Sequence, residues 1–285
     1  MIDAVPLVST EWLAARLGTA NLKIADASWY LPQAGRDAKR EYEADHIPGA
    51  VFFDIDALSD HTTDLPHMLP RGTAFASGVK KLGVGDADLV VFYDGAGIYS
   101  SPRALWMMRA MGHARAAVLD GGLPKWRREG RPTESGVVTI ATVGRRHFTA
   151  RPEHSLIRDF SAMHANLATR SEQIVDARSP TRFRGEEPEP RRGVRPGHMP
   201  NSVNIHYAEV LNADGTMRSA NDLKELFAKR GVELERPVVT SCGSGVTAAI
   251  LSLALELAGA KKIALYDGSW AEWGGRADAP VETGA

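Results

Sequence analysis

The hydrophobic positions of this chain fall into short runs that alternate with longer amphipathic stretches. Residues 22–25, 89–93 and 116–119 are apolar runs, each bounded by Asp or Gly. Such runs predict strands of a parallel sheet that is buried on both faces. The stretches between them have helical spacing. An alternation of strand and helix predicts an α/β fold in which helices cover both faces of the sheet.

Two of the predicted helices have readable ends. Ser9 or Thr10 can cap a helix over residues 11–17, and Asn221 can cap a helix over residues 222–230. A glycine follows each stretch, which is the residue that most often ends a helix. We therefore expect both helices to end at these glycines.

The pattern occurs twice along the chain. Four motifs of the first half return in the same order in the second half, at an offset of about 150 residues. The paired motifs contain Asp26 and Asp176, His46 and His198, Asp94 and Cys242, and Asp120 and Asp267. A repeat of this kind indicates a duplicated domain.

The length agrees with two domains, because 285 residues exceed what one hydrophobic core usually holds. We place an N-terminal domain at residues 1–140 and a C-terminal domain at residues 156–285. Between them, residues 141–155 are the expected linker, where Pro152 and a cluster of polar residues interrupt the periodicity.

The charge pattern excludes several classes of function. The formal net charge is −1, with acidic and basic residues mixed, so the basic excess of a nucleic-acid binder is missing. The longest apolar stretch, residues 246–258, is interrupted by polar residues and is too short to span a bilayer. The first ten residues lack the layout of a signal peptide. We expect a cytoplasmic protein that binds neither nucleic acid nor membrane.

The single cysteine, Cys242, limits the chemistry further. One cysteine excludes an internal disulfide and any metal or iron–sulfur site that needs several cysteines. We expect no metal and no organic cofactor. A lone cysteine is ordinarily a small buried hydrophobe. Its surroundings here favour a reactive thiol instead.

Cys242 directly follows an apolar run, residues 238–241, that predicts a strand. A loop with two glycines comes next, and an apolar helix over residues 248–258 ends at Gly259. Sites in α/β proteins form at the carboxyl ends of strands, and a helix N-terminus offers unpaired N–H groups. Such a loop stabilises a thiolate, the reactive form of cysteine.

The loop CGSGVTA at residues 242–248 resembles the active-site signature of the 3-mercaptopyruvate sulfurtransferases, a branch of the rhodanese superfamily. The resemblance covers nearly the whole chain. It implies two tandem rhodanese-like domains, each a parallel sheet with helices on both faces. It also implies an inactive N-terminal domain, in which Asp94 stands at the cysteine position. The loop residues that would hold the sulfur are Gly243, Gly245, Val246 and Thr247.

The resemblance implies a reaction in which Cys242 takes the sulfur of 3-mercaptopyruvate as a persulfide. A thiol such as thioredoxin, or cyanide, then removes the sulfur, and pyruvate is released. One alternative is a thiosulfate sulfurtransferase, but Gly243 and Ser244 are neutral where thiosulfate enzymes typically carry basic residues. Another is a non-catalytic binding module, which would not need the intact loop. A phosphatase would need an Arg at the end of the loop, where this chain has Ala248.

The segment at residues 181–191 resembles the substrate loop of the same family. By that resemblance Arg182 and Arg191 bind the carboxylate and ketone of mercaptopyruvate, which a guanidinium fork can grip. The other interpretation is that these arginines only form ion pairs with the glutamates of the same segment. Those glutamates are Glu186, Glu187 and Glu189.

A third group of site residues is expected from the first half of the chain. By the resemblance, Asp56 and His67 join Ser244 in the active site. The carboxylate would fix the imidazole tautomer, and the imidazole would move protons through the serine hydroxyl. The alternatives are a polar contact between domains, or Asp54 and His61 in the same roles.

Overall fold

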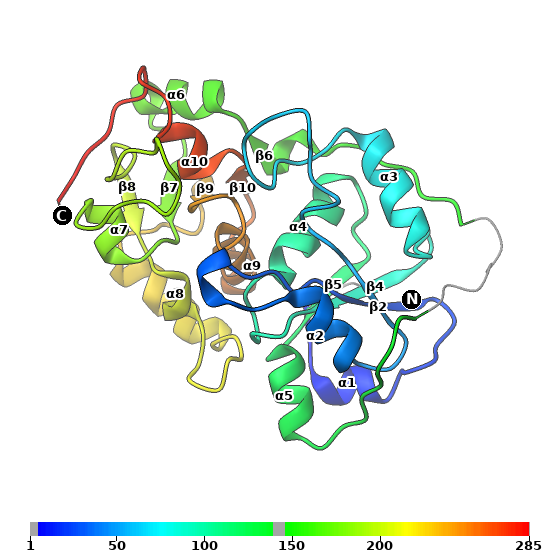
Figure 1. Ribbon diagram of the computed structural model, residues 1–285. Coiled ribbons are helices and arrows are strands. Elements are labelled where there is room, and N and C mark those ends of the chain that lie inside the picture. The colour runs from blue at the N-terminus through cyan, green and yellow to red at the C-terminus, as the bar shows by residue number, and fades with distance from the viewer. Residues whose placement is uncertain (1–4, 139–145, 285) are drawn as a thin grey trace. The chain divides into compact units, whose positions relative to one another are not determined.

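The computed structural model describes residues 5–138 and 146–284 (Figure 1). The chain divides into two compact units. Unit 1 contains Met1–Asp60, Leu69–Glu153 and Ala213–Met217, and unit 2 contains His61–Met68, His154–Asn212 and Arg218–Ala285. Each unit therefore includes a short segment from the other half of the sequence. Of the predicted linker, residues 141–145 lie outside the described residues and residues 146–153 belong to unit 1.

Unit 1 is built on a parallel sheet with the strand order β1-β5-β4-β2-β3. Its strands are β1 (Leu7–Val8), β2 (Leu22–Asp26), β3 (Ala50–Phe52), β4 (Leu89–Tyr93) and β5 (Ala116–Leu119). Its helices are α1 (Thr10–Ala14), η1 (Pro32–Ala34), α2 (Ala38–Ala44), α3 (Gly72–Lys81), α4 (Ser101–Ala110) and α5 (Gly122–Arg128).

The helices of unit 1 cover both faces of its sheet. Leu13 of α1, Tyr42 of α2 and Trp126 of α5 share one buried cluster with Val91 and Tyr93 of the central strand β4. Figure 1 shows α3 and α4 on the other side of these strands. A strand covered on both faces must be apolar at every position, and all five residues of β4 are buried.

Unit 2 has the same topology, with the strand order β6-β10-β9-β7-β8. Its strands are β6 (Ile157–Arg158), β7 (Gln173–Asp176), β8 (Ser202–Asn204), β9 (Val238–Ser241) and β10 (Ile263–Tyr266). Its helices are η2 (His154–Leu156), α6 (Phe160–Thr169), α7 (Pro180–Arg184), η3 (Tyr207–Val210), α8 (Ala220–Lys229), α9 (Ala248–Ala258) and α10 (Ser269–Trp273).

The two faces of the second sheet are covered in the same way. Met163 of α6 and the two tryptophans of α10, Trp270 and Trp273, are buried in one cluster with Ile174 and Val239 of the sheet. Helices α8 and α9 are in contact with each other, and Figure 1 shows them on the other side of the strands. The duplicated α/β fold expected from the sequence is confirmed.

One predicted helix start was wrong. Helix α8 begins at Ala220, and the hydroxyl oxygen of Ser219 accepts the backbone N–H of Asp222, so Ser219 is the N-cap. Asn221 lies inside the first turn. Helix α1 is capped by Ser9 as expected, but it ends at Ala14, before the predicted residue 17. No helix in the described part of the chain is long and apolar enough to cross a membrane.

Candidate active site

Cys242 directly follows β9, at the carboxyl edge of the second sheet, and only 2% of it is exposed. Its Sγ accepts a hydrogen bond from the backbone N–H of Gly245 at 3.1 Å. Gly245 has φ +79°, a left-handed conformation that turns the loop back toward the sulfur and favours glycine. The backbone of Cys242 is held as well, because its N–H donates to Ser269 Oγ and its carbonyl accepts the N–H of Trp270.

The loop presents further donors beyond Gly245. Within the described residues, the backbone N–H groups of Val246, Thr247 and Ala248 donate to no acceptor. Val246 and Ala248 are buried, so water does not easily replace the missing partner. Unpaired buried N–H groups at a helix N-terminus form an anion site. This loop can therefore hold a negatively charged sulfur.

The equivalent loop of unit 1 shows such a site with a built-in anion. Asp94 follows β4 as Cys242 follows β9, and its carboxylate is fully buried. Asp94 Oδ2 accepts the backbone N–H groups of Tyr99, Ser100 and Ser101 at 2.8–3.0 Å and the hydroxyl of Ser101 at 2.7 Å. The same fold position thus holds a permanent carboxylate in one repeat and a thiol in the other.

Arg182, in α7, lies directly against the cysteine loop. A Cβ atom added to Gly243 would meet Nη2 of Arg182 at 3.0 Å, so a larger residue here would require the Arg182 side chain to shift by a few tenths of an ångström. Arg182 also forms an ion pair with Glu189, with 2.5 Å between Nη2 and Oε2. The ion pair expected by the alternative interpretation is therefore present. It leaves the guanidinium beside the loop rather than drawing it away.

Glu189 belongs to a buried network of charges. Its side chain is 4% exposed and accepts hydrogen bonds from both Arg178 and Arg182. Arg178 is fully buried, donates to the carboxylate of Asp176 at the end of β7, and stacks over Trp270. Burial works against the charged form of Arg178, but Asp176 and Glu189 outweigh it and raise the pKa of its guanidinium.

The other arginines of this segment have separate environments. Arg191 is half-buried. Arg184 pairs with the exposed Glu186 at 2.6 Å. Arg195 donates to backbone carbonyls of the C-terminal segment, including Gly274 and Ala279, so it has a structural role.

His67 faces the cysteine loop within unit 2. Its Nδ1 lies 3.0 Å from Ser244 Oγ, and both residues are 6% exposed. His67 has φ +60°, a strained conformation for a non-glycine residue that persists only where its surroundings fix it. His61, the alternative, is exposed. The geometry favours His67 as the partner of the serine.

Asp56 belongs to unit 1, where it is exposed and its Oδ2 accepts the indole N–H of Trp29 at 3.0 Å. Asp54 Oδ1 accepts the backbone N–H of Ala57, which closes a turn. Asp54 and Asp56 are thus each held by a hydrogen bond within unit 1, and the choice of Asp56 for the relay stays a prediction.

Sequence reasoning missed Ser269 as a residue of this site. It has φ +48°, its Oγ accepts the N–H of Cys242, and its hydroxyl donates to the carbonyl of Tyr266. A signal was present, because the first repeat has Gly122, also left-handed, at the corresponding position. Replacing a left-handed glycine by serine is costly unless the side chain is used.

Comparison with known proteins identifies the family to which this chain belongs. The Rhodanese-like domain family matches residues 9–129 and 159–276. The chain is 46% identical over 273 residues to human 3-mercaptopyruvate sulfurtransferase, covering 94% of this chain and 91% of the human one. It is 42% identical to the 3-mercaptopyruvate sulfurtransferase of Escherichia coli K12, covering 96% and 97%. The crystal structure of SseA from Escherichia coli superposes with a TM-score of 0.84 at 38% identity, covering 94% and 99%. The chain belongs to the rhodanese-like family, within its branch of 3-mercaptopyruvate sulfurtransferases.

Proposed function

We propose that this chain moves the sulfur of 3-mercaptopyruvate to a thiol acceptor through a persulfide on Cys242. The Cys242 thiolate attacks the substrate sulfur, so an S–S bond forms and the C–S bond breaks. The electron pair of the C–S bond leaves on carbon as the enolate of pyruvate, which then takes up a proton. A thiol attacks the outer sulfur, becomes a persulfide itself and returns Cys242 to its thiolate.

The observation that carries this proposal is the set of unpaired N–H groups around the sulfur. The amides of Val246, Thr247 and Ala248 have no acceptors in the described chain, and Val246 and Ala248 are buried. An outer sulfur on Cys242 would supply the anion that Asp94 supplies in unit 1. Preorganised amides stabilise such a charge without reorganisation. A scaffold module would have no use for an anion site around a cysteine.

The donor is 3-mercaptopyruvate because of the loop charges and the relatives. Gly243 and Ser244 are neutral, and Arg182 shares its charge with Glu189, so the site suits a monoanion better than the thiosulfate dianion. We assign the substrate carboxylate and ketone to Arg182 and Arg191, whose guanidinium forks match that planar group.

The protons are assigned to Ser244 and His67. The 3.0 Å contact between His67 Nδ1 and Ser244 Oγ allows a proton to pass between the imidazole and the hydroxyl. Asp56 as the carboxylate that fixes the imidazole tautomer, thioredoxin as the acceptor and a cytoplasmic location stay predictions.

The test is intact-protein mass spectrometry after brief incubation with 3-mercaptopyruvate or, separately, with thiosulfate. We expect a gain of one sulfur atom per chain that is faster with 3-mercaptopyruvate and absent in Cys242→Ser. A gain mainly from thiosulfate would keep the nucleophile but contradict the donor. No gain from either donor would support the scaffold alternative.

A further inference from the structure

The second repeat carries polar residues at two positions where the first repeat has a left-handed glycine. Ser269 replaces Gly122 and has φ +48°, and Asn201 replaces Gly49 and has φ +62°. The side chain of Ser269 holds Cys242 in place, which accounts for the strain. Asn201 lies elsewhere in unit 2, so its carboxamide needs a separate explanation.

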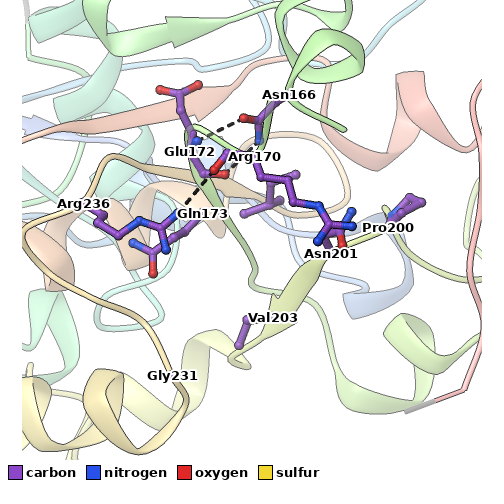
Figure 2. A pocket seen from close by; sticks show the side chains of 10 residues that line it. Asn166, Arg170, Glu172, Gln173, Pro200, Asn201, Val203, Gly231 and Arg236 are labelled. Atoms are coloured by element: carbon purple, nitrogen blue, oxygen red, sulfur yellow. Dashed lines mark hydrogen bonds between the residues drawn. The ribbon is translucent and has the colours of Figure 1, made fainter. Parts of the chain in front are cut away.

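The left-handed non-glycine residues form two groups. In the described residues they are His67 and Ser269, at the cysteine loop, and Arg170 and Asn201. The second pair lines one cavity of about 240 Å³ (Figure 2). Arg170 has this conformation as the C-cap of α6, and Asn201 has it just before β8. Helix ends and asparagines often adopt it.

The cavity lies at the amino ends of β7 and β8, whereas Cys242 follows the carboxyl end of β9. The two sites are thus at opposite edges of the same parallel sheet, separated by the four residues of β7, or about 13 Å of strand. Ile174, Pro200 and Val203 form its apolar wall.

Several polar groups of the wall are already used by the fold. Asn166 exchanges hydrogen bonds with the backbone of Glu172, and Gln173 does so with the backbone of Glu233. Both oxygens of Glu172 accept from Arg158, at 2.7 and 2.8 Å. These groups are satisfied, and the charge of Glu172 is compensated.

The groups that remain are a guanidinium and a carboxamide, on the exposed residues Arg170 and Asn201. Within the described residues, neither of these two groups has a hydrogen-bond partner. Figure 2 shows Arg170 and Asn201 among the side chains that line the cavity. Arg236 adds a second cation and is tied only by an exposed contact to Glu233 and by a bond to the carbonyl of Arg170. The cavity is therefore cationic.

We propose that this cavity is a second binding site, specific for a small organic carboxylate. The guanidinium of Arg170 and the amide N–H of Asn201 donate to the carboxylate oxygens, as guanidinium forks do. The apolar wall covers the short carbon chain. The volume limits the ligand to a molecule of a few carbon atoms.

The test is a titration of the full chain with succinate, followed by the backbone amide signals in NMR. We expect saturable shifts at Asn201, Val203 and Gly231. Arg170→Gln should weaken this binding at least tenfold. Arg40→Gln removes the same charge from an exposed site of unit 1 and should leave it unchanged.

A second variant separates binding from folding. Asn201→Gly restores the residue found at Gly49 and relieves the left-handed strain, so the protein should unfold at the same or a higher temperature. Succinate binding should nevertheless weaken several-fold. Shifts confined to residues 243–247 would place the carboxylate at Arg182 and overturn the proposal. Equal shifts with sulfate would overturn the preference for an organic ligand, and no saturable shift would overturn the site.

Discussion

At the scale of single residues, the position of Arg182 depends on Glu189. The carboxylate is 4% exposed and is shared between the guanidinium groups of Arg178 and Arg182. Because Arg178 is itself fixed by Asp176, the shared carboxylate fixes Arg182 beside Gly243. Glu189 also offsets part of the positive charge that a substrate meets at Arg182.

We expect Glu189→Gln to change the donor preference. The amide cannot accept from both arginines, so Arg182 becomes less ordered, and the site gains one unit of positive charge. The KM for 3-mercaptopyruvate should rise about tenfold, the loss of roughly one charge-assisted hydrogen bond. The ratio of kcat/KM for thiosulfate to that for mercaptopyruvate should rise as well, measured with both donors.

The matched control is Glu186→Gln, which removes an exposed partner of Arg184. It should alter neither the KM for 3-mercaptopyruvate nor the ratio of the two kcat/KM values. Circular dichroism must show that the Glu189 variant is folded, because breaking a buried ion pair costs about 3–5 kcal/mol. Equal changes for the two donors would contradict a role of Glu189 in selectivity.

These residues also show what sequence can and cannot predict about the site. The loop around Cys242 is continuous in sequence, so its placement could be predicted from a strand followed by a helix. Glu189 belongs to a run of mixed charges, and nothing in that run distinguishes the buried glutamate from the exposed Glu186. Burial is decided by tertiary packing, which local patterns do not contain.

At the scale of elements, the loops after β4 and β9 share one arrangement, in which backbone amides point toward the side chain of the first loop residue. The loop after β4 closes on the carboxylate of Asp94, which accepts from three backbone amides and a hydroxyl through one oxygen. The loop after β9 has the thiol of Cys242 there and leaves amides unpaired in the described chain. The first loop therefore has more of its amides paired than the second.

Asp94→Asn should destabilise unit 1 without affecting sulfur loading. A neutral amide accepts more weakly, and its NH2 group opposes the N–H donors, which costs about 2–4 kcal/mol. The midpoint of urea unfolding should fall, whereas the gain of sulfur on Cys242 should be retained. Ser101→Ala removes a single donor and should cost about 1 kcal/mol. An unchanged midpoint for the Asn variant would show that the carboxylate does not hold this loop.

Strands and helices could be predicted from the sequence where the hydrophobic pattern was long enough. The runs at residues 89–93 and 116–119 match β4 and β5 because central strands are apolar throughout. The edge strands β1 and β6 have two residues each, too few for any periodicity. The start of α8 was mispredicted because Ser219 and Asn221 are both good caps and only the backbone geometry decides between them.

At the scale of the whole molecule, the two units treat an equivalent buried aspartate differently. Asp176 of unit 2 is paired with Arg178. Asp26 of unit 1 is 2% exposed and has hydrogen bonds but no ion pair among the described contacts. Burial raises the pKa of Asp26 to about 6, and the charge of Asp94 adds to this, although hydrogen bonds from Ser28 and Tyr93 oppose it.

Unit 1 should therefore lose stability as the pH rises. The folded pKa of Asp26 lies above the ordinary value of 3.8, so folded Asp26 holds its proton more tightly than the unfolded chain does. Stability is fully present below pH 4 and is lost as the pH rises through 6, by about 3 kcal/mol. Asp26→Asn should stabilise unit 1 at pH 7 by up to that amount and by nothing at pH 4. The stability of unit 1 at pH 4 and pH 7 is measured by urea unfolding, followed through hydrogen exchange of the backbone amides in β2 and β4.

Asp176→Asn is the control with the opposite sign. It leaves Arg178 buried without its main partner, so unit 2 should be destabilised at pH 7 by about 3–5 kcal/mol. If Asp26→Asn also destabilises its unit at pH 7, then the ionised carboxylate of Asp26 stabilises the fold, and the predicted loss of stability with rising pH is wrong.

The exchange of segments between the two units has a consequence for the order in which a ribosome makes this chain. Unit 1 includes Ala213–Met217, so it cannot be completed until most of the polypeptide has emerged. Unit 2 includes His61–Met68, which is synthesised early and must wait for its partners. Neither half can finish folding as an independent nascent domain. The reactive cysteine loop and the histidine that faces it therefore come together only after about 180 further residues have been made, when the loop itself has emerged.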